Sequence, residues 1–135
     1  MKQKTYILII LSSLLILATV VSGYFWMQQA EKQAFITKQE SRITEYLKYN
    51  VPSCKTITFT DNYKLPTGSI SIDGYLNNNK ILGFTMTVSL AGGETDFEGV
   101  GGYTDELDKL FRKDVKTVSQ IEKIEKEQKE NSKSE

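Results

Sequence analysis

The sequence predicts an α+β protein: an N-terminal transmembrane helix, then a helix, a three- to four-stranded antiparallel sheet and a C-terminal helix. Three observations predict this arrangement. Residues 6–27 carry no charged side chain. Residues 57–90 contain short runs in which apolar and polar side chains alternate between turn residues, as is typical of antiparallel strands. Apolar residues at helical spacing lie on both sides of that region, which gives a layered α+β arrangement.

The first element is the apolar segment Tyr6–Met27. At about 1.5 Å per helical residue it reaches about 33 Å, enough to cross a hydrocarbon core of about 30 Å. Its aromatic residues, such as Trp26, lie near the two ends, where such rings suit the headgroup level. Lys2 and Lys4 precede the span without an acid, so the positive-inside rule makes residues 1–5 a cytoplasmic tail. The sequence therefore predicts a single-pass protein of the cell membrane with its C-terminal domain outside.

A cleaved signal peptide is the alternative, with Val21-Ser22-Gly23 as the small-residue cleavage site. The apolar run continues past that site to Met27, which favours a retained signal anchor. The single cysteine, Cys54, lies too far beyond the span to be a lipidated N-terminal residue. An exported domain without a disulfide suits a Gram-positive envelope.

Residues 28–50 are predicted to form a membrane-proximal helix, because they contain no glycine or proline. Its apolar stripe consists of Ile36, Ile43 and Leu47. Pro52 predicts its end near Asn50-Val51, since a residue before proline is pushed out of the helical region. Residues 51–121 are predicted to form the extracytoplasmic α+β domain, including the C-terminal helix.

The predicted strands are short and follow one another closely. In the second strand, Ile70, Ile72 and Leu76 share the core face, with Ser71, Asp73 and Tyr75 opposite. Asparagines tolerate positive φ, so the asparagine-rich segment 77–80 predicts a hairpin turn before the next strand. The predicted strands are 57–60, 70–76, 82–90 and, as a short fourth strand, 95–100.

The C-terminal helix is predicted to begin at Thr104 and to continue to Ile121. Threonine caps a first helical turn, and Asp105 and Glu106 suit the positive end of the helix dipole. Residues 122–135 are almost entirely charged or polar, so a disordered tail is predicted there.

Composition excludes several classes of function. Two of the 17 basic residues, Lys2 and Lys4, precede the span, so the outer part has a net charge of about −2, which argues against nucleic-acid binding. The chain contains no histidine, which removes the usual nucleophilic triads and histidine zinc sites. Cys54 alone is expected to be a plain packed residue. The sequence therefore predicts no catalytic residue, no cofactor and no metal ligand.

An acidic run and several tyrosines remain as candidate binding residues. Six acids and no base occur between Glu94 and Asp108. Paired carboxylates could serve glycoside hydrolysis or hold calcium, but a helix start and a solvated strand edge also explain them. Exposed tyrosine is favoured at protein interfaces, although tyrosines can equally complete the core. The candidate partner-binding residues are Tyr75, Glu94, Asp96, Glu98 and Tyr103.

Four short motifs resemble a family of small Gram-positive exported proteins. They are Glu45-Tyr46-Leu47-Lys48-Tyr49-Asn50, Thr56-Ile57-Thr58-Phe59-Thr60, Pro66-Thr67-Gly68 and Ile72-Asp73-Gly74-Tyr75-Leu76-Asn77. The members of that family are lipoproteins or single-span proteins, often in tandem copies, with a domain of unknown function. The resemblance covers about residues 40–115 and supplies no catalytic residue. The chain departs from the family in lacking a lipobox cysteine, which supports a helical anchor.

Two functional hypotheses follow. The favoured one is a membrane-anchored extracytoplasmic binding protein without catalytic activity, an immunity protein that neutralises a secreted toxin aimed at the cell envelope. Its partners are the bilayer, through residues 6–27, and a protein, either the toxin or an envelope protein. The alternative is a cell-envelope enzyme or assembly factor that uses surface carboxylates.

Overall fold

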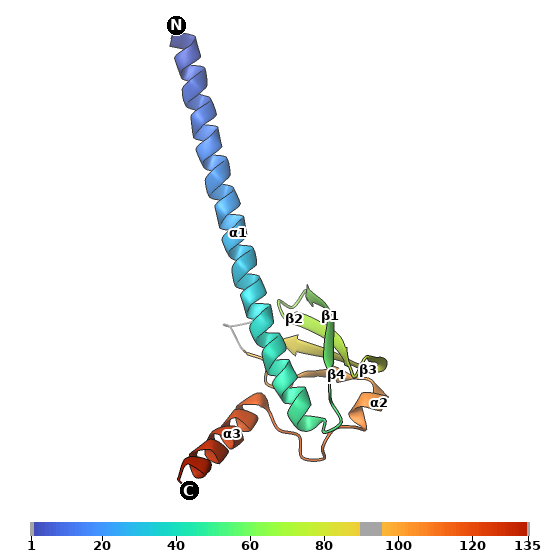
Figure 1. Cartoon of the computed structure of the whole chain (residues 1–135). Helices are drawn as coiled ribbons and strands as arrows, with labels where there is room; N and C mark the ends of the chain where they lie inside the picture. Colours follow the sequence, from blue (N-terminus) through green and yellow to red (C-terminus); the bar gives the residue numbers. More distant parts are fainter. Residues whose placement is uncertain (1, 90–95, 135) are drawn as a thin grey trace. The chain divides into compact units, whose positions relative to one another are not determined.

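The computed structural model describes residues 2–89 and 96–134. The chain forms two compact units, Met1–Thr37 and Lys38–Glu135. Helix α1 (Lys2–Asn50) begins in the first unit and ends in the second (Figure 1).

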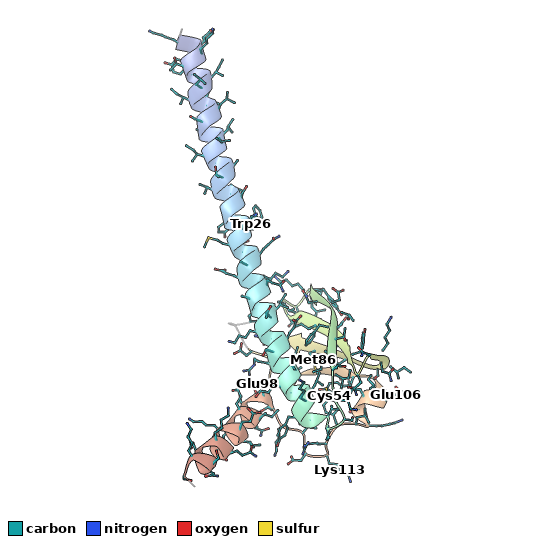
Figure 2. All side chains as sticks on the ribbon, in the orientation of Figure 1. Trp26, Cys54, Met86, Glu98, Glu106 and Lys113 are labelled. Carbon is teal, nitrogen blue, oxygen red and sulfur yellow. The ribbon has the colours of Figure 1, made fainter. Side chains whose placement is uncertain are left out.

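The described part of the first unit is helical throughout. Within the described residues, α1 is long and apolar enough to cross a membrane, and the side chains of its most apolar stretch are not buried. Trp26, labelled in Figure 2, is 80% exposed. A continuous apolar surface of this length fits a lipid environment, so the predicted membrane-spanning helix is supported.

Helix α1 ends at the predicted place. Asn50 is its last residue, and the Val51 amide still donates to the Leu47 carbonyl at 2.8 Å before the chain turns at Pro52. The predicted apolar stripe is also confirmed, because Ile36, Ile43 and Leu47 are all buried.

Four antiparallel strands form one sheet in the second unit, in the spatial order β1-β2-β3-β4. Each strand therefore pairs with the next one in the sequence, which makes the sheet a meander. The strands are β1 (Ile57–Lys64), β2 (Ile70–Leu76), β3 (Asn79–Val88) and β4 (Gly101–Tyr103).

Strand β1 is longer than predicted, because it continues beyond Thr60 to Lys64. A register shift between Phe59 and Asp61 interrupts the alternation of side chains there. Such a bulge places one extra residue in a strand, so a period of two no longer identifies it. The turn between β1 and β2 is consequently confined to residues 65–69, where Gly68 has φ +90°.

The hairpin between β2 and β3 is confirmed. Asn77 and Asn78 both have φ +55°, the left-handed conformation that a two-residue turn of this kind requires. The side-chain oxygen of Asn77 also accepts the amides of Lys55 and Thr56, at 2.7 and 3.2 Å. The turn therefore holds the entry to β1 as well.

The fourth strand was predicted at residues 95–100, and its described part is not a strand. Instead, side chains from α1 hold this segment, since Gln39 accepts the Phe97 amide at 2.6 Å and Arg42 donates to the Phe97 carbonyl at 2.9 Å. These bonds satisfy the backbone without a strand partner. Pairing begins only at Gly101, opposite Met86.

The inner face of the sheet forms the core. Tyr46 of α1 contacts Tyr103 of β4 on this side, with 3.1 Å between their hydroxyl oxygens. The buried residues that the sheet contributes were predicted from the alternation, and they are Ile70, Ile72, Leu76, Phe84, Met86 and Val88. Leu82 is half-buried, and Leu90 lies outside the described residues.

The opposite side of the sheet is called the outer face. Residues directly opposite one another in an antiparallel pair share a face, so the register defines its members. They are Thr58, Asp61, Tyr63, Ser71, Asp73, Tyr75, Gly83, Thr85, Thr87 and Gly102. Apart from the buried Ser71, each is half-buried or exposed.

The predicted C-terminal helix from Thr104 to Ile121 is wrong in its continuity. Thr104 does cap a helix, since its side chain accepts the Leu107 amide, but this helix, α2 (Asp105–Asp108), is only one turn long. The chain then turns away because Asn50 holds it: the Asn50 carbonyl accepts the Arg112 amide at 2.7 Å. The second helix, α3 (Val118–Lys133), begins after Thr117.

The segment predicted as a disordered tail belongs to α3, which is helical as far as Lys133. A capping box starts this helix: the Thr117 side chain accepts the Gln120 amide, and the Gln120 side chain accepts the Thr117 amide. The buried side chains of Val118 and Ile121 then hold its first turn against the rest of the unit.

Candidate functional site

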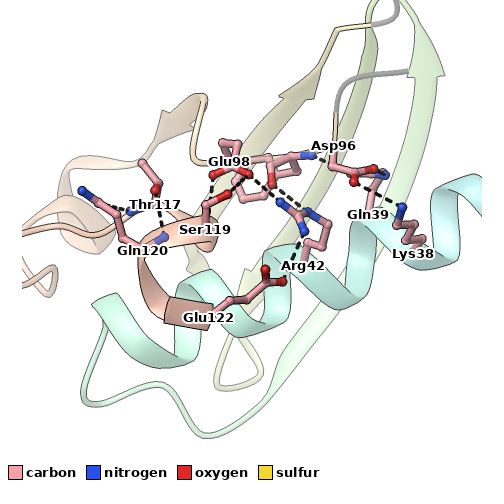
Figure 3. A network of polar contacts seen from close by, with 10 residues as sticks. Lys38, Gln39, Arg42, Asp96, Glu98, Thr117, Ser119, Gln120 and Glu122 are labelled. Carbon is pink, nitrogen blue, oxygen red and sulfur yellow. Dashed lines mark hydrogen bonds and ion pairs between the residues drawn. The ribbon is translucent and has the colours of Figure 1, made fainter. Parts of the chain in front are cut away.

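The predicted carboxylates Asp96 and Glu98 belong to a network of polar contacts between α1, the segment before β4 and α3 (Figure 3). Asp96 accepts a hydrogen bond from the Gln39 side chain at 3.0 Å and pairs with the Lys38 ammonium at 3.2 Å. Gln39 is fully buried and also accepts the Phe97 amide. The Asp96 carboxylate therefore helps to orient a buried side chain.

Glu98 connects α1 to the start of α3. Its carboxylate lies 2.7 Å from the Arg42 guanidinium, and it accepts the Ser119 hydroxyl at 2.6 Å and the Ser119 amide at 3.1 Å. The Glu98 carbonyl accepts the Val118 amide. Amides at a helix start lack intrahelical partners and carry partial positive charge, so a carboxylate stabilises this end.

The surroundings lower the pKa of both carboxyl groups. For Asp96 the main cause is the hydrogen bond from Gln39, with a further contribution from Lys38. For Glu98 burial alone raises the pKa, but the hydrogen bonds from Ser119 and the charge of Arg42 outweigh it. Both groups are therefore ionised at neutral pH and engaged within the chain.

Replacing Glu98 with glutamine should lower the free energy of unfolding by about 1 kcal/mol at pH 7, a modest loss because the pair is partly exposed. The pKa of Glu98 is lower in the folded chain than its ordinary value of 4.5. Its stabilising effect is therefore complete above about pH 4.5 and is lost as the pH falls through the folded-state pKa. Denaturant unfolding of the full chain in detergent micelles, from pH 7 to pH 3, measures the difference between the two proteins.

Asp114→Asn is the matched control. Its carboxylate pairs with Lys116 at 2.9 Å, but its side chain is 83% exposed, so the loss should be below about 0.5 kcal/mol. A difference between wild type and Glu98→Gln that stays constant down to pH 3 would contradict the assigned role of Glu98.

Tyr103 lies in an aromatic cluster on the inner face of the sheet. Its ring centroid is 4.5 Å from that of Phe111, and Tyr46, which shares a hydroxyl contact with Tyr103, meets Phe97 edge-on at 5.3 Å. Burial, together with the hydrogen bond to Tyr46, raises the pKa of Tyr103 far above its ordinary value. Tyr103 therefore completes the core, which was one of the two interpretations that the sequence left open.

Tyr75 occupies the outer face and is half-buried. It is thus separated from Tyr103 by the sheet, and the structure does not bring the predicted residues together as one patch. Glu94 lies outside the described residues.

Within residues 2–89 and 96–134, nothing covers the centre of the outer face. Thr85 belongs to β3, which has a strand on either side, yet its side chain is exposed. A Cβ atom placed on Gly102, the partner of Thr85 on β4, would meet no atom within 4 Å. A shallow hollow lies over β3 and β4 at this point. Its lining residues are Gly83, Phe84, Thr85, Gly102, Tyr103 and Thr104.

Sequence reasoning placed Asp73 on the same face as Tyr75 but did not select it. Asp73 lies directly between Asp61 on β1 and Thr85 on β3. One of its carboxylate oxygens is buried and has no hydrogen-bond partner among the residues that the structure describes. A charged residue on the outer side of a central strand was the available signal.

Cys54 and the acidic residues are the groups that nucleophilic or metal chemistry would use. Burial raises the pKa of the Cys54 thiol, with Lys48 opposing in part, which disfavours the thiolate that a nucleophile needs. In residues 2–89 and 96–134, no three His, Cys, Asp or Glu side chains lie together as a metal site would require.

This geometry defines a class of protein: a small α+β domain with one open sheet face, preceded by an apolar N-terminal helix. Residues 35–123 match the family described as a protein of unknown function, DUF1433, and the chain belongs to this family. The domain is also similar to the folded 79-residue fragment of Lin0334 from Listeria innocua, whose solution NMR structure has 39% sequence identity and a TM-score of 0.53. That match covers 64% of this chain and 90% of the fragment. No curated protein matches.

Proposed function

We propose that this protein is a membrane-anchored extracytoplasmic binding protein without catalytic activity, which holds a protein partner on its outer sheet face. The observation that carries the proposal is the open centre of that face, where Thr85 and Gly102 are exposed. Two tyrosines, Tyr63 and Tyr75, also belong to this face. Tyrosine offers a large contact area at a low entropy cost, which suits a protein interface.

The anchor supports a position at the membrane. Its bilayer partner is the apolar stretch of α1, residues 6–27, and Lys2 and Lys4 favour a cytoplasmic N-terminus. The outer face would then meet molecules outside the cell. This position, together with the absence of a catalytic arrangement among the described residues, favours a role in immunity against a secreted toxin. An envelope protein is the alternative partner.

The enzyme alternative has no specific observation in its favour. The carboxylates on which it depends, Asp96 and Glu98, are bonded to Gln39, Arg42 and Ser119 within the chain. A reacting group would have to compete with these contacts.

A photo-crosslinking residue at position 85, carried by the full chain in intact cells, tests the proposal. Secreted proteins encoded by the neighbouring genes are added from outside, and we expect one that kills control cells to give a crosslinked product while the expressing cells survive. The matched control carries the same residue at position 126, which is exposed on α3, and should give survival without the crosslink. If the cells gave no crosslink and gained no protection, with the secreted proteins or with envelope proteins, the proposal would be overturned.

A further inference from the structure

The outer face contains an unsatisfied acceptor. Asp73 lies on β2, an inner strand of the sheet, and its buried Oδ1 is recorded without a hydrogen-bond partner among the described residues. Buried polar atoms in native proteins almost always have a partner, and a missing one costs about 1–3 kcal/mol. In the free chain the charge of the Asp73 carboxylate is therefore incompletely compensated.

The neighbouring residue on β1, Asp61, adds a second negative charge beside it. Asp61 lies directly opposite Asp73 in the register, and like charges in such a pair repel each other. Asp61 is only partly compensated, because its own Oδ1 accepts the Asn62 amide at 2.8 Å. None of the residues that define the outer face is basic, so the charged side chains assigned to this face are all negative.

The neighbour on the other side of Asp73 leaves room for a ligand. Thr85 is exposed, and the hollow over Gly83 and Gly102 begins beside it because neither glycine has a side chain. A long, flexible side chain could lie across this bare backbone. Tyr75 lies directly opposite Gly83, one of the residues that line the hollow, and offers it an aromatic ring on the same face.

We propose that the outer face recognises a basic protein surface, and that an arginine side chain of the partner lies over the hollow and pairs with the half-buried Asp73 carboxylate from its solvent-accessible side. This inference rests on the proposed function and specifies the chemistry of its partner. A guanidinium group supplies several donors in a planar fork, which suits a carboxylate, and it stacks on aromatic rings. The negative face repels anionic polymers and lipid headgroups, so charge complementarity selects a basic protein.

The test uses the full chain in phosphatidylcholine nanodiscs, with empty nanodiscs as the blank. The probe is a fluorescent decapeptide in which arginine and serine alternate, compared with the same peptide made with glutamate in place of arginine. We expect the arginine peptide to bind and to weaken as salt is added, and Asp73→Asn to reduce its affinity at least about tenfold. Asp105→Asn removes the same charge from an exposed residue of α2 and should leave the affinity unchanged.

Thr85→Lys is the second variant, because it supplies a cation to Asp73 from within the chain. It should abolish peptide binding while the unfolding temperature stays the same or rises, so that lost binding cannot be attributed to misfolding. Equal binding by wild type and Asp73→Asn, or an equal loss in Asp105→Asn, would overturn the assignment. A toxin crosslink at position 85 that persists in Asp73→Asn would leave the binding function standing and remove this inference alone.

Discussion

Replacing Gly74 with alanine should destabilise the domain by about 3 kcal/mol, at the upper end of what overpacking a core position costs. Gly74 lies on the inner face of β2, between β1 and the ring of Phe84. A Cβ atom there would collide with the Thr58 carbonyl oxygen and would lie 2.6 Å from Cζ of Phe84. Because the first of these neighbours is backbone, β1 itself must move away from β2 to relieve the collision.

The Phe84 ring has little freedom to retreat, since it meets the Phe59 ring edge-on with 5.9 Å between centroids. Thermal unfolding of the full chain in detergent micelles, followed by near-ultraviolet circular dichroism, measures the loss. Gly102→Ala is the matched control, because its Cβ would meet nothing within 4 Å, and it should change stability by less than about 0.5 kcal/mol.

A double-mutant cycle separates the two collisions. Phe84→Leu removes the ring, so the cost of Gly74→Ala should fall by about 1 kcal/mol in that background and not vanish, because the Thr58 carbonyl remains. Equal stability of Gly74→Ala and Gly102→Ala would show that β1 yields without cost, contrary to this prediction.

Replacing Asn50 with alanine should cost about 3 kcal/mol and lower the unfolding temperature by about 15 °C, for a domain of this size. Asn50 is fully buried. Its Nδ2 donates to the carbonyls of Tyr46 and Lys116, both at 2.9 Å, and its Oδ1 accepts the Lys116 amide at 2.8 Å. Alanine would leave both backbone groups of Lys116 without these partners in a part-buried place.

Hydrogen exchange gives a second, local readout of Asn50→Ala. The Lys116 amide bonds to the Asn50 side chain and should lose protection, whereas the Arg112 amide bonds to the Asn50 backbone carbonyl, which alanine retains, and should lose less. Asn131→Ala changes an exposed asparagine in α3 and should leave stability and this protection nearly unchanged. Full protection of Lys116 in Asn50→Ala would show that the segment before α3 is held by other contacts.

Local patterns predicted much of the fold. Four features each depend on a few adjacent residues, and each was predicted correctly. They are the helix over the uncharged run at residues 6–27, the end of α1 before Pro52, the Asn77-Asn78 hairpin and the buried face of β2 and β3. The start of α3 was also within reach, because Thr117 and Gln120 have the spacing of a capping box. The break after α2 could not be predicted from local sequence, since it depends on Asn50, which is far away in the sequence.

The candidate site shows the same division. Alternation alone placed Tyr75 and Asp73 on the side of β2 that faces away from the core. The roles of Asp96 and Glu98 could not be read from the acidic run, because their partners lie on α1 and α3. For Tyr103 the sequence left surface and core equally open, and its contacts with Tyr46 and Phe111 place it in the core.

By itself, then, the sequence determined the apolar N-terminal helix, the hairpin between β2 and β3 and the face that these two strands bury, since these follow from the period of the side chains and from local turn chemistry. The tertiary structure decided that the helix after Thr104 stops after one turn, which carboxylates are engaged within the chain and which face of the sheet stays open. Those outcomes depend on pairings between residues more than 50 positions apart, such as Arg42 with Glu98, which no local pattern encodes.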